Sequence, residues 1–70
     1  MKLIIFGASG ATGQEIIAQS LEQGHQVTAF VRSPAKLNLK HPNLRIAHGD
    51  VLDLMSVEAA LAGQDAVLVA

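Results

Sequence analysis

The sequence predicts an α/β fold, in which crossover helices flank a doubly wound parallel sheet. Short runs of β-branched and aromatic residues alternate with helical segments along the whole chain, and this alternation is typical of parallel sheets. Half of the residues are hydrophobic, as expected for strands that are covered on both faces. The chain has no internal repeat and no low-complexity linker.

The chain opens with a strand over residues 3–6, which Gly7 ends. Thr12 and Glu15 have the spacing of a capping box, which predicts that the next helix begins there with Thr12 as its N-cap. Gly24 is placed to end this helix in a left-handed conformation. The apolar face of the helix is expected to contain Ile16, Ile17 and Leu21.

A second strand is predicted over residues 27–31. Ser33 then stands as an N-cap before Pro34, which opens a short helix through about Leu37. Residues 38–43 contain a proline and are expected to form a loop, and a weaker third strand follows over residues 44–47.

The last predicted unit begins with Asp53 as a helix N-cap. Gly63 is placed to close the helix, and a fourth strand is predicted over residues 65–70. The residues that share one face of this helix are Leu54, Val57 and Leu61.

Right-handed crossovers and doubly wound topology predict the strand order third, second, first, fourth. This is the first half of a Rossmann sheet plus one strand. The last strand would form an open edge, and such edges tend to recruit another strand. Seventy residues are also fewer than the roughly 100–200 of a usual domain. We therefore expect either a fragment of a larger domain or pairing with a second copy, and the sequence leaves both open.

Composition excludes several kinds of site and partner. The chain has no cysteine, and so no disulfide or thiolate metal site. The five basic residues are scattered and the net charge is −1, unlike the basic stripe of a nucleic-acid binder. The apolar runs are too short for a membrane span or a signal peptide, and the three histidines lack metal-site spacing. We expect a soluble, cytoplasmic protein with no partner among nucleic acids, membranes or metals.

Three glycines follow the first strand at positions 7, 10 and 13, in the sequence Gly-Ala-Ser-Gly-Ala-Thr-Gly. In a dinucleotide-binding turn, Gly7 would allow the tight turn, Gly10 would let the backbone approach a pyrophosphate, and Gly13 would permit close packing of helix on strand. The N–H groups near Gly10, Ala11 and Thr12 would face the phosphates, and the Ser9 and Thr12 hydroxyls could add hydrogen bonds. The alternative is an ordinary strand–helix turn without a ligand.

The end of the second strand favours NADP(H) over NAD(H). NAD sites usually place a carboxylate there for the ribose 2′-hydroxyl, whereas this chain has Arg32, followed by Ser33 and Lys36. An arginine can bind a 2′-phosphate through two hydrogen bonds. The alternative is that Arg32 is a solvated charge at a strand end.

After the third strand, Asp50 and Val51 fall on the same edge of the sheet as the glycine loop. Asp50 could accept a hydrogen bond from an adenine amino group, and Val51 could pack on the ring. Local capping of the following loop is an equally good role for Asp50.

The sequence resembles the atypical short-chain dehydrogenase/reductase family, namely the NAD(P)H-binding NmrA-like and biliverdin-IXβ reductase/flavin reductase-like proteins. The resemblance covers the whole chain and rests on four segments in order. These segments are residues 4–13, residues 24–28 with Val31-Arg32, residues 49–52, and residues 62–67.

The resemblance implies that residues 1–70 are the N-terminal part of a single NAD(P)-binding Rossmann domain. It assigns the pyrophosphate to residues 7–13, the 2′-phosphate to Arg32, the adenine to Asp50 and Val51, and the nicotinamide ribose to the strand end at Ala70. The chain has no tyrosine, so the Tyr-x-x-x-Lys pair of typical members is absent and no catalytic residue is assigned.

Three functions remain open. The first is the cofactor-binding part of an NAD(P)H-dependent reductase of a flavin, quinone, tetrapyrrole or similar acceptor, in which the 70 residues alone are not catalytic. The second is a non-catalytic NADP(H) sensor, as among NmrA-like proteins. The third is an isolated structural half-Rossmann unit.

Overall fold

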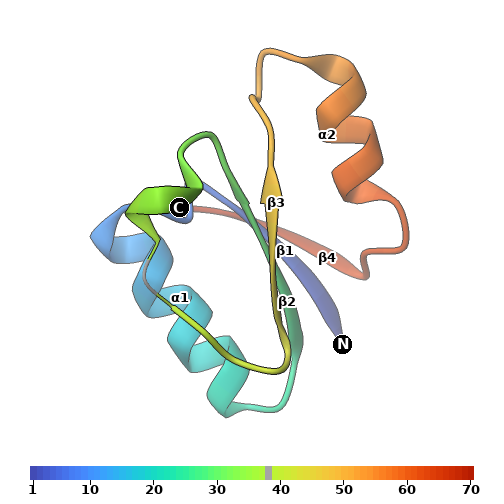
Figure 1. Cartoon of the computed structure of the whole chain (residues 1–70). Coiled ribbons are helices and arrows are strands. Elements are labelled where there is room, and N and C mark those ends of the chain that lie inside the picture. Colours follow the sequence, from blue (N-terminus) through green and yellow to red (C-terminus); the bar gives the residue numbers. More distant parts are fainter. Residues whose placement is uncertain (38) are drawn as a thin grey trace.

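We describe the chain from a computed structural model that covers residues 1–37 and 39–70. Its centre is a four-stranded parallel sheet in the order β3-β2-β1-β4 (Figure 1). This order confirms the predicted topology. The strands are β1 (Lys2–Phe6), β2 (Gln26–Val31), β3 (Leu44–His48) and β4 (Ala66–Val69).

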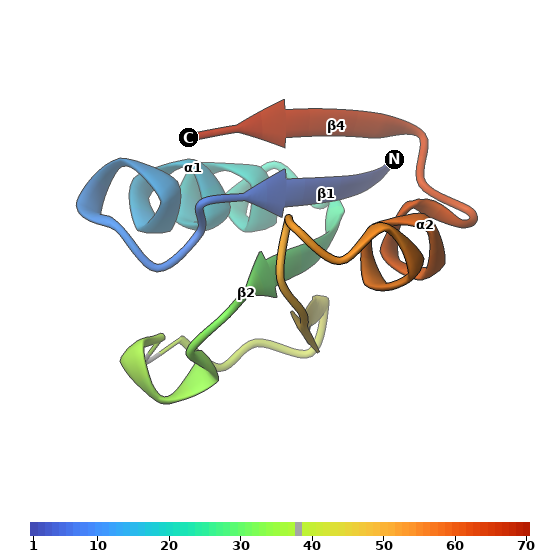
Figure 2. The ribbon, with the colours of Figure 1, turned by 90° about the horizontal axis from the view of Figure 1, so that it is seen from above.

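The helical elements lie on both faces of this sheet. Helix α1 (Ala11–Glu22) covers one face and helix α2 (Leu54–Leu61) lies on the other (Figures 1 and 2). A short 3₁₀ turn, η1 (Pro34–Lys36), connects β2 to β3 on the α1 side. The chain thus winds outward from β1 in one direction to β3, and then returns across the sheet to β4.

The hydrophobic core lies between α1 and the sheet. Alternate residues of β1 and β2 point toward α1, so period-two patterning places their apolar side chains on one face. Ile17 of α1 is fully buried against them. The buried core residues are Ile5, Ala8, Ile17, Val27, Ala29, Val31 and Leu37.

The start of α1 differs from the predicted capping box. The helix begins at Ala11, and Gly10 occupies the N-cap with φ −77° and ψ 169° and without a side-chain hydrogen bond. Thr12 therefore lies inside the first turn, and Glu15 accepts a hydrogen bond from the Gln19 side chain (3.1 Å) instead. The predicted cap was wrong because the extended backbone that an N-cap requires is at Gly10.

The turn after β2 is also shorter than predicted. Ser33 occupies the N-cap position before Pro34, but its side chain forms no capping hydrogen bond. The segment is a single 3₁₀ turn that ends at Lys36, because Leu37 returns to an extended backbone (φ −107°, ψ 109°). This conformation lets Leu37 enter the core on the α1 side.

The start of α2 is as predicted, whereas its packing is loose. Asp53 is the N-cap, and its Oδ1 accepts from the Met55 N–H (3.1 Å). The predicted apolar face does not pack into a hydrophobic core, because no residue of α2 is buried and Leu54 is 68% exposed. Gly63 after this helix has a positive φ as expected, and so does Gly24 after α1.

Among the described residues, no helix has the length and apolar character needed to cross a membrane.

Candidate dinucleotide-binding site

The glycine loop connects β1 to α1 at the carboxyl end of the sheet, and close backbone contacts fix its path. Gly7 has φ +73°, and a Cβ added there would lie 2.9 Å from the Ala70 carbonyl oxygen. A Cβ at Gly13 would lie 2.5 Å from the Gly7 carbonyl oxygen and 2.7 Å from Ala8 Cα. The tight turn at Gly7 and the close helix–strand packing at Gly13 therefore both require glycine.

The amino end of α1 faces solvent beside this loop. Gly10, Ala11 and Thr12 are exposed, and the first N–H groups of a helix have no partner within the helix. The first turn contains no acidic residue that would repel an anion. The Gln14 side chain donates to the Ser9 carbonyl (2.9 Å) and so ties the loop to the helix. The arrangement is suited to binding phosphate oxygens.

A cavity of about 300 Å³ opens between the glycine loop and the ends of β2 and β3. It brings together five of the predicted site residues, which are Gly7, Ser9, Arg32, Asp50 and Val51. Its remaining lining residues are Ala8, Phe30, Val31 and Gly49. Residues far apart in the sequence therefore converge on one hollow at the edge that carries the loop.

Arg32 is exposed at the end of β2 and lines this cavity. Ser33 is also exposed, but it does not line the cavity. The side chain of Lys36, the third residue predicted here, lies outside the described part of the structure. Arg32 therefore places a positive charge at the wall of the cavity, where it can bind an anion.

Asp50 performs the local role that the sequence offered as an alternative. Its Oδ1 accepts from the Leu52 N–H (2.9 Å), and its carbonyl accepts from the Ser56 hydroxyl (3.1 Å) and the Asp53 N–H (2.9 Å). Asp50 nevertheless lines the cavity with Val51, which is 64% exposed. The turn therefore holds the carboxylate in place at the cavity wall.

The remaining predicted residues lie around the cavity and do not line it. Gly13 is buried under the loop, so its part is packing, whereas Gly10, Ala11 and Thr12 continue the loop into the helix. Ala70 lies on the β4 side of Gly7, where its N–H donates to the Phe6 carbonyl (2.9 Å). Ala70 therefore lies beside the start of the loop without lining the cavity.

The cavity contains four residues that were not predicted as site residues, and two of them, Phe30 and Gly49, are in close contact. The Phe30 ring packs against the Phe6 ring, with centroids 4.9 Å apart. A Cβ added to Gly49 would lie 2.6 Å from Phe30 Cζ, and the Gly49 N–H donates to the Val31 carbonyl (3.0 Å). Strand alternation could have identified Phe30, because its side chain lies on the sheet face opposite to that of Val31. Its pairing with Phe6 places the two rings side by side.

The site can hold an anionic, extended ligand, because it combines free backbone donors, an arginine and an apolar wall. A dinucleotide bound across the loop would extend from the β2–β3 side to the β4 side. The crevice between these two sides is the point where the strand order reverses. Within the described residues, no group of three or more histidines, cysteines or carboxylates could hold a metal ion.

Comparison with known proteins agrees with this geometry. Residues 7–70 match a protein family described as NAD(P)H-binding. The chain is 35% identical over 66 residues to a 3-beta-hydroxysteroid dehydrogenase of Mycolicibacterium neoaurum, and 38% over 72 residues to a 2-alkyl-3-oxoalkanoate reductase of Stenotrophomonas maltophilia. It is also 34% identical over 69 residues to the photosystem II assembly factor Ycf39 of Synechocystis. These matches cover 94%, 96% and 97% of this chain, but only 18%, 20% and 21% of the relatives.

Solved structures show the same fold. An epimerase candidate from Bacteroides thetaiotaomicron superposes with a TM-score of 0.91 at 36% identity, over 99% of this chain and 32% of that protein. A candidate NADH-flavin reductase from Streptococcus pneumoniae gives 0.79 at 36% identity, over 100% and 30%. A uronate dehydrogenase variant from Agrobacterium tumefaciens, complexed with NAD, gives 0.84 at 25% identity, over 97% and 25%.

The chain therefore spans about a fifth to a third of the proteins it matches. The family match covers nearly all of its residues and includes the glycine loop, β2 and the Asp50 turn. Together with the Rossmann-type strand order, this identifies the chain as a member of the NAD(P)H-binding family, in agreement with its resemblance to atypical short-chain dehydrogenases/reductases.

Proposed function

We propose that this chain binds the adenosine and pyrophosphate part of NADP(H). The observation that carries the proposal is the convergence of Arg32 and the glycine loop on one cavity. In this proposal the N–H groups near Gly10 bind the pyrophosphate, and Arg32 binds the 2′-phosphate through two hydrogen bonds. Asp50 and Val51 flank the adenine, and Ala70 lies toward the nicotinamide ribose.

The preference for NADP(H) rests on charge. Arg32 is exposed at the cavity rim, where a 2′-phosphate would add a charge-assisted contact that NAD(H) cannot make. Asp50 lies on the same wall, but its Oδ1 is held by the Leu52 N–H, which restrains it from turning freely toward the ribose. Hydrogen bonds between charged groups contribute about 1.5–3 kcal/mol, so we expect NADPH to bind roughly tenfold or more tightly than NADH.

The test is a titration of the chain with NADPH and with NADH by isothermal calorimetry. We expect measurable binding that favours NADPH, and loss of the preference in Arg32→Ala while NADH binding is unchanged. Lys40→Ala, which removes an exposed cation on a different loop, is the matched control and should keep the preference. Equal affinity of the unmodified chain for the two cofactors would contradict the role of Arg32.

For the complete protein we propose an NAD(P)H-dependent reductase of a flavin, quinone, tetrapyrrole or similar unsaturated acceptor. Support comes from relatives whose names describe a reductase and a dehydrogenase, and from the NADH-flavin reductase candidate among the similar structures. Hydride transfer requires the nicotinamide to be held against a substrate. The chain itself contributes cofactor binding, and the test is oxidation of NADPH by the complete protein with each class of acceptor.

A non-catalytic role is the second candidate, because one relative is a photosystem assembly factor rather than a named enzyme. In that case NADP(H) binding would regulate contact with a partner protein. The two candidates differ in one measurement: a sensor binds NADPH without oxidising it in the presence of any acceptor. Sustained NADPH oxidation by the complete protein would exclude the sensor.

A further inference from the structure

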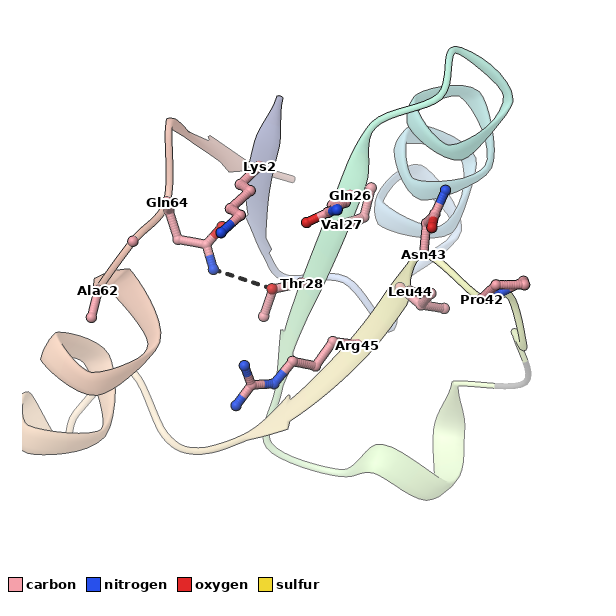
Figure 3. Close-up of a pocket in the computed structure, with 11 residues that line it drawn as sticks. Lys2, Gln26, Val27, Thr28, Pro42, Asn43, Leu44, Arg45, Ala62 and Gln64 are labelled. Carbon is pink, nitrogen blue, oxygen red and sulfur yellow. Dashed lines mark hydrogen bonds between the residues drawn. The ribbon is translucent and has the colours of Figure 1, made fainter.

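A second cavity, of about 390 Å³, lies at the opposite end of the sheet from the glycine loop. It is bounded by the amino ends of β1, β2 and β3 and by the loop that follows α2 (Figure 3). Its polar lining residues are Lys2, Gln26, Thr28, Asn43, Arg45 and Gln64. No residue lines both this cavity and the cavity beside the glycine loop, so a ligand here would not displace a cofactor bound there.

Strand register places four of these polar residues on the α2 side of the sheet. Lys2 pairs with Gln26, and Thr28 pairs with Arg45, and paired residues of parallel strands project to the same face. A sheet covered on both faces carries apolar residues on both. The alternate positions on the α1 side follow that rule, and they are Leu3, Val27 and Leu44. Farther along the strands the α2 side is apolar as well, with Ile4 and Phe30 buried, so the polar side chains are confined to the amino ends of the strands, where they border the cavity.

A hydrogen bond across the cavity orients the groups in its centre. Gln64 Nε2 donates to Thr28 Oγ1 (3.1 Å) and to the Ala60 carbonyl (3.3 Å), and Figure 3 shows the first of these contacts. Because the Thr28 oxygen accepts this bond, its own proton stays available to donate. The Arg45 side chain extends from β3 toward the same side of the sheet (Figure 3).

The charges around this cavity are positive. Lys2 and Arg45 are its ionisable lining residues, and no carboxylate of the described residues lines it. The nearby Asp65 carboxylate accepts from the Lys2 backbone N–H (2.8 Å) and is not part of the lining. A guanidinium presents parallel donors that match two oxygens of a phosphate, and an ammonium adds a point charge.

We propose that this cavity binds the phosphate group of a small phosphate monoester. Arg45 binds two phosphate oxygens, Lys2 supplies the second positive charge, and the Thr28 hydroxyl donates to the third oxygen. The amide side chains of Gln26 and Asn43 face the remainder of the molecule. The cavity volume falls at the lower end of small-molecule sites, which span roughly 300–1,000 Å³, so a compact ester fits the site.

The test is a titration of the ¹⁵N-labelled chain with inorganic phosphate at constant ionic strength, followed by NMR. We expect saturable shifts of the Thr28 and Arg45 amides and of the Gln64 side-chain amide. Arg45→Gln should weaken binding about tenfold or more, as expected for loss of a charged hydrogen-bond partner. Lys40→Gln removes the same charge from an exposed position that does not line the cavity and should leave the affinity unchanged.

Two outcomes would overturn the proposal. Shifts confined to the amides of Gly10, Ala11 and Thr12 would mean that phosphate binds only at the glycine loop. Shifts near Arg45 that do not saturate, or that chloride reproduces, would mean that the polar side chains are merely hydrated. Circular dichroism would verify that Arg45→Gln is folded, and Lys2→Gln, which changes another exposed residue, provides the second variant with the same expected loss.

Discussion

Replacing Gly13 with alanine tests whether contact between α1 and the glycine loop holds the dinucleotide site together. The added Cβ would lie 2.5 Å from the Gly7 carbonyl oxygen and 2.7 Å from Ala8 Cα. Ordinary contact begins near 3.4 Å, so the backbone must give by about 0.9 Å. Both neighbours are backbone atoms, so no side-chain rotation relieves the clash and α1 must move away from β1.

The expected magnitude follows from two opposing terms. Overpacking costs about 1–3 kcal/mol, and a clash with backbone on both sides places Gly13→Ala at the upper end of that range. Alanine regains about 1 kcal/mol because it favours the helix more than glycine does. The net loss in free energy of unfolding is therefore about 2 kcal/mol. A chain of 70 residues has a total of roughly 4–10 kcal/mol, so this loss is a large fraction.

Urea unfolding followed by far-ultraviolet circular dichroism measures this loss. The matched control is Gly10→Ala, whose added Cβ meets only the Gly7 carbonyl oxygen, at 3.9 Å. Its stability should stay within about 1 kcal/mol of the unmodified chain, the usual range of N-cap effects. NADPH binding should nevertheless weaken, because the Cβ enters the space offered to the pyrophosphate. Equal urea midpoints for Gly13→Ala and the unmodified chain would refute the packing argument.

Four further substitutions test the rest of the fold. Asp53→Ala removes the cap that accepts from the Met55 N–H and should lower the free energy of unfolding by about 1 kcal/mol, measured by urea unfolding. Ile17→Ala should lower the free energy of unfolding by about 2–5 kcal/mol because Ile17 is fully buried. Leu54→Ala, at a 68% exposed site, should change it by no more than about 0.5 kcal/mol. Similar losses for both variants would mean that α2 is packed. If the chain self-associates through β4, Val69→Lys should shift light scattering toward the monomer, since charges block edge pairing; an unchanged mass from an associated chain would exclude that edge.

Most of the sheet could be predicted from the sequence because β1, β2 and β4 are apolar runs near a glycine or proline, whereas β3 contains Arg45 and His48 and was the weaker prediction. Handedness and alternation then leave few orders, and the observed β3-β2-β1-β4 is one of them. Helix ends that depend on one local contact were also predictable. Asp53 caps α2 as expected, since a carboxylate two residues before an N–H suffices.

The start of α1 shows where such local patterns fail. Thr12 and Glu15 have capping-box spacing, yet the chain bends earlier, at Gly10. The spacing predicted Thr12 as the N-cap, but it could not show that the extended backbone of an N-cap occurs two residues earlier. The N-cap lies at Gly10 because the tight turn at Gly7 and the close contact at Gly13 determine where the helix must begin.

The exposed face of α2 was unpredictable for a different reason. Helical spacing shows which residues share a face, but it does not show whether anything lies against that face. The same limit applies to the site. Arg32 and Asp50 could be predicted from their positions at strand ends, whereas the Phe30–Gly49 contact depends on how β2 and the loop after β3 meet in space.

Strand β4 contributes to the dinucleotide site although it adds no residue to the cavity. The Asp65 N–H donates to the Lys2 carbonyl (2.7 Å) at one end of β1, and the Ala70 N–H donates to the Phe6 carbonyl (2.9 Å) at the other. The second contact comes immediately before Gly7, so β4 helps to set where the glycine loop begins. Val69, near that end of β4, is 79% exposed, and strands with little buried area open at low free energy. Under the proposed function, in which residues 7–13 bind the pyrophosphate, cofactor binding and pairing along β4 would be coupled, because a contact that stabilises β4 would also stabilise the start of the glycine loop.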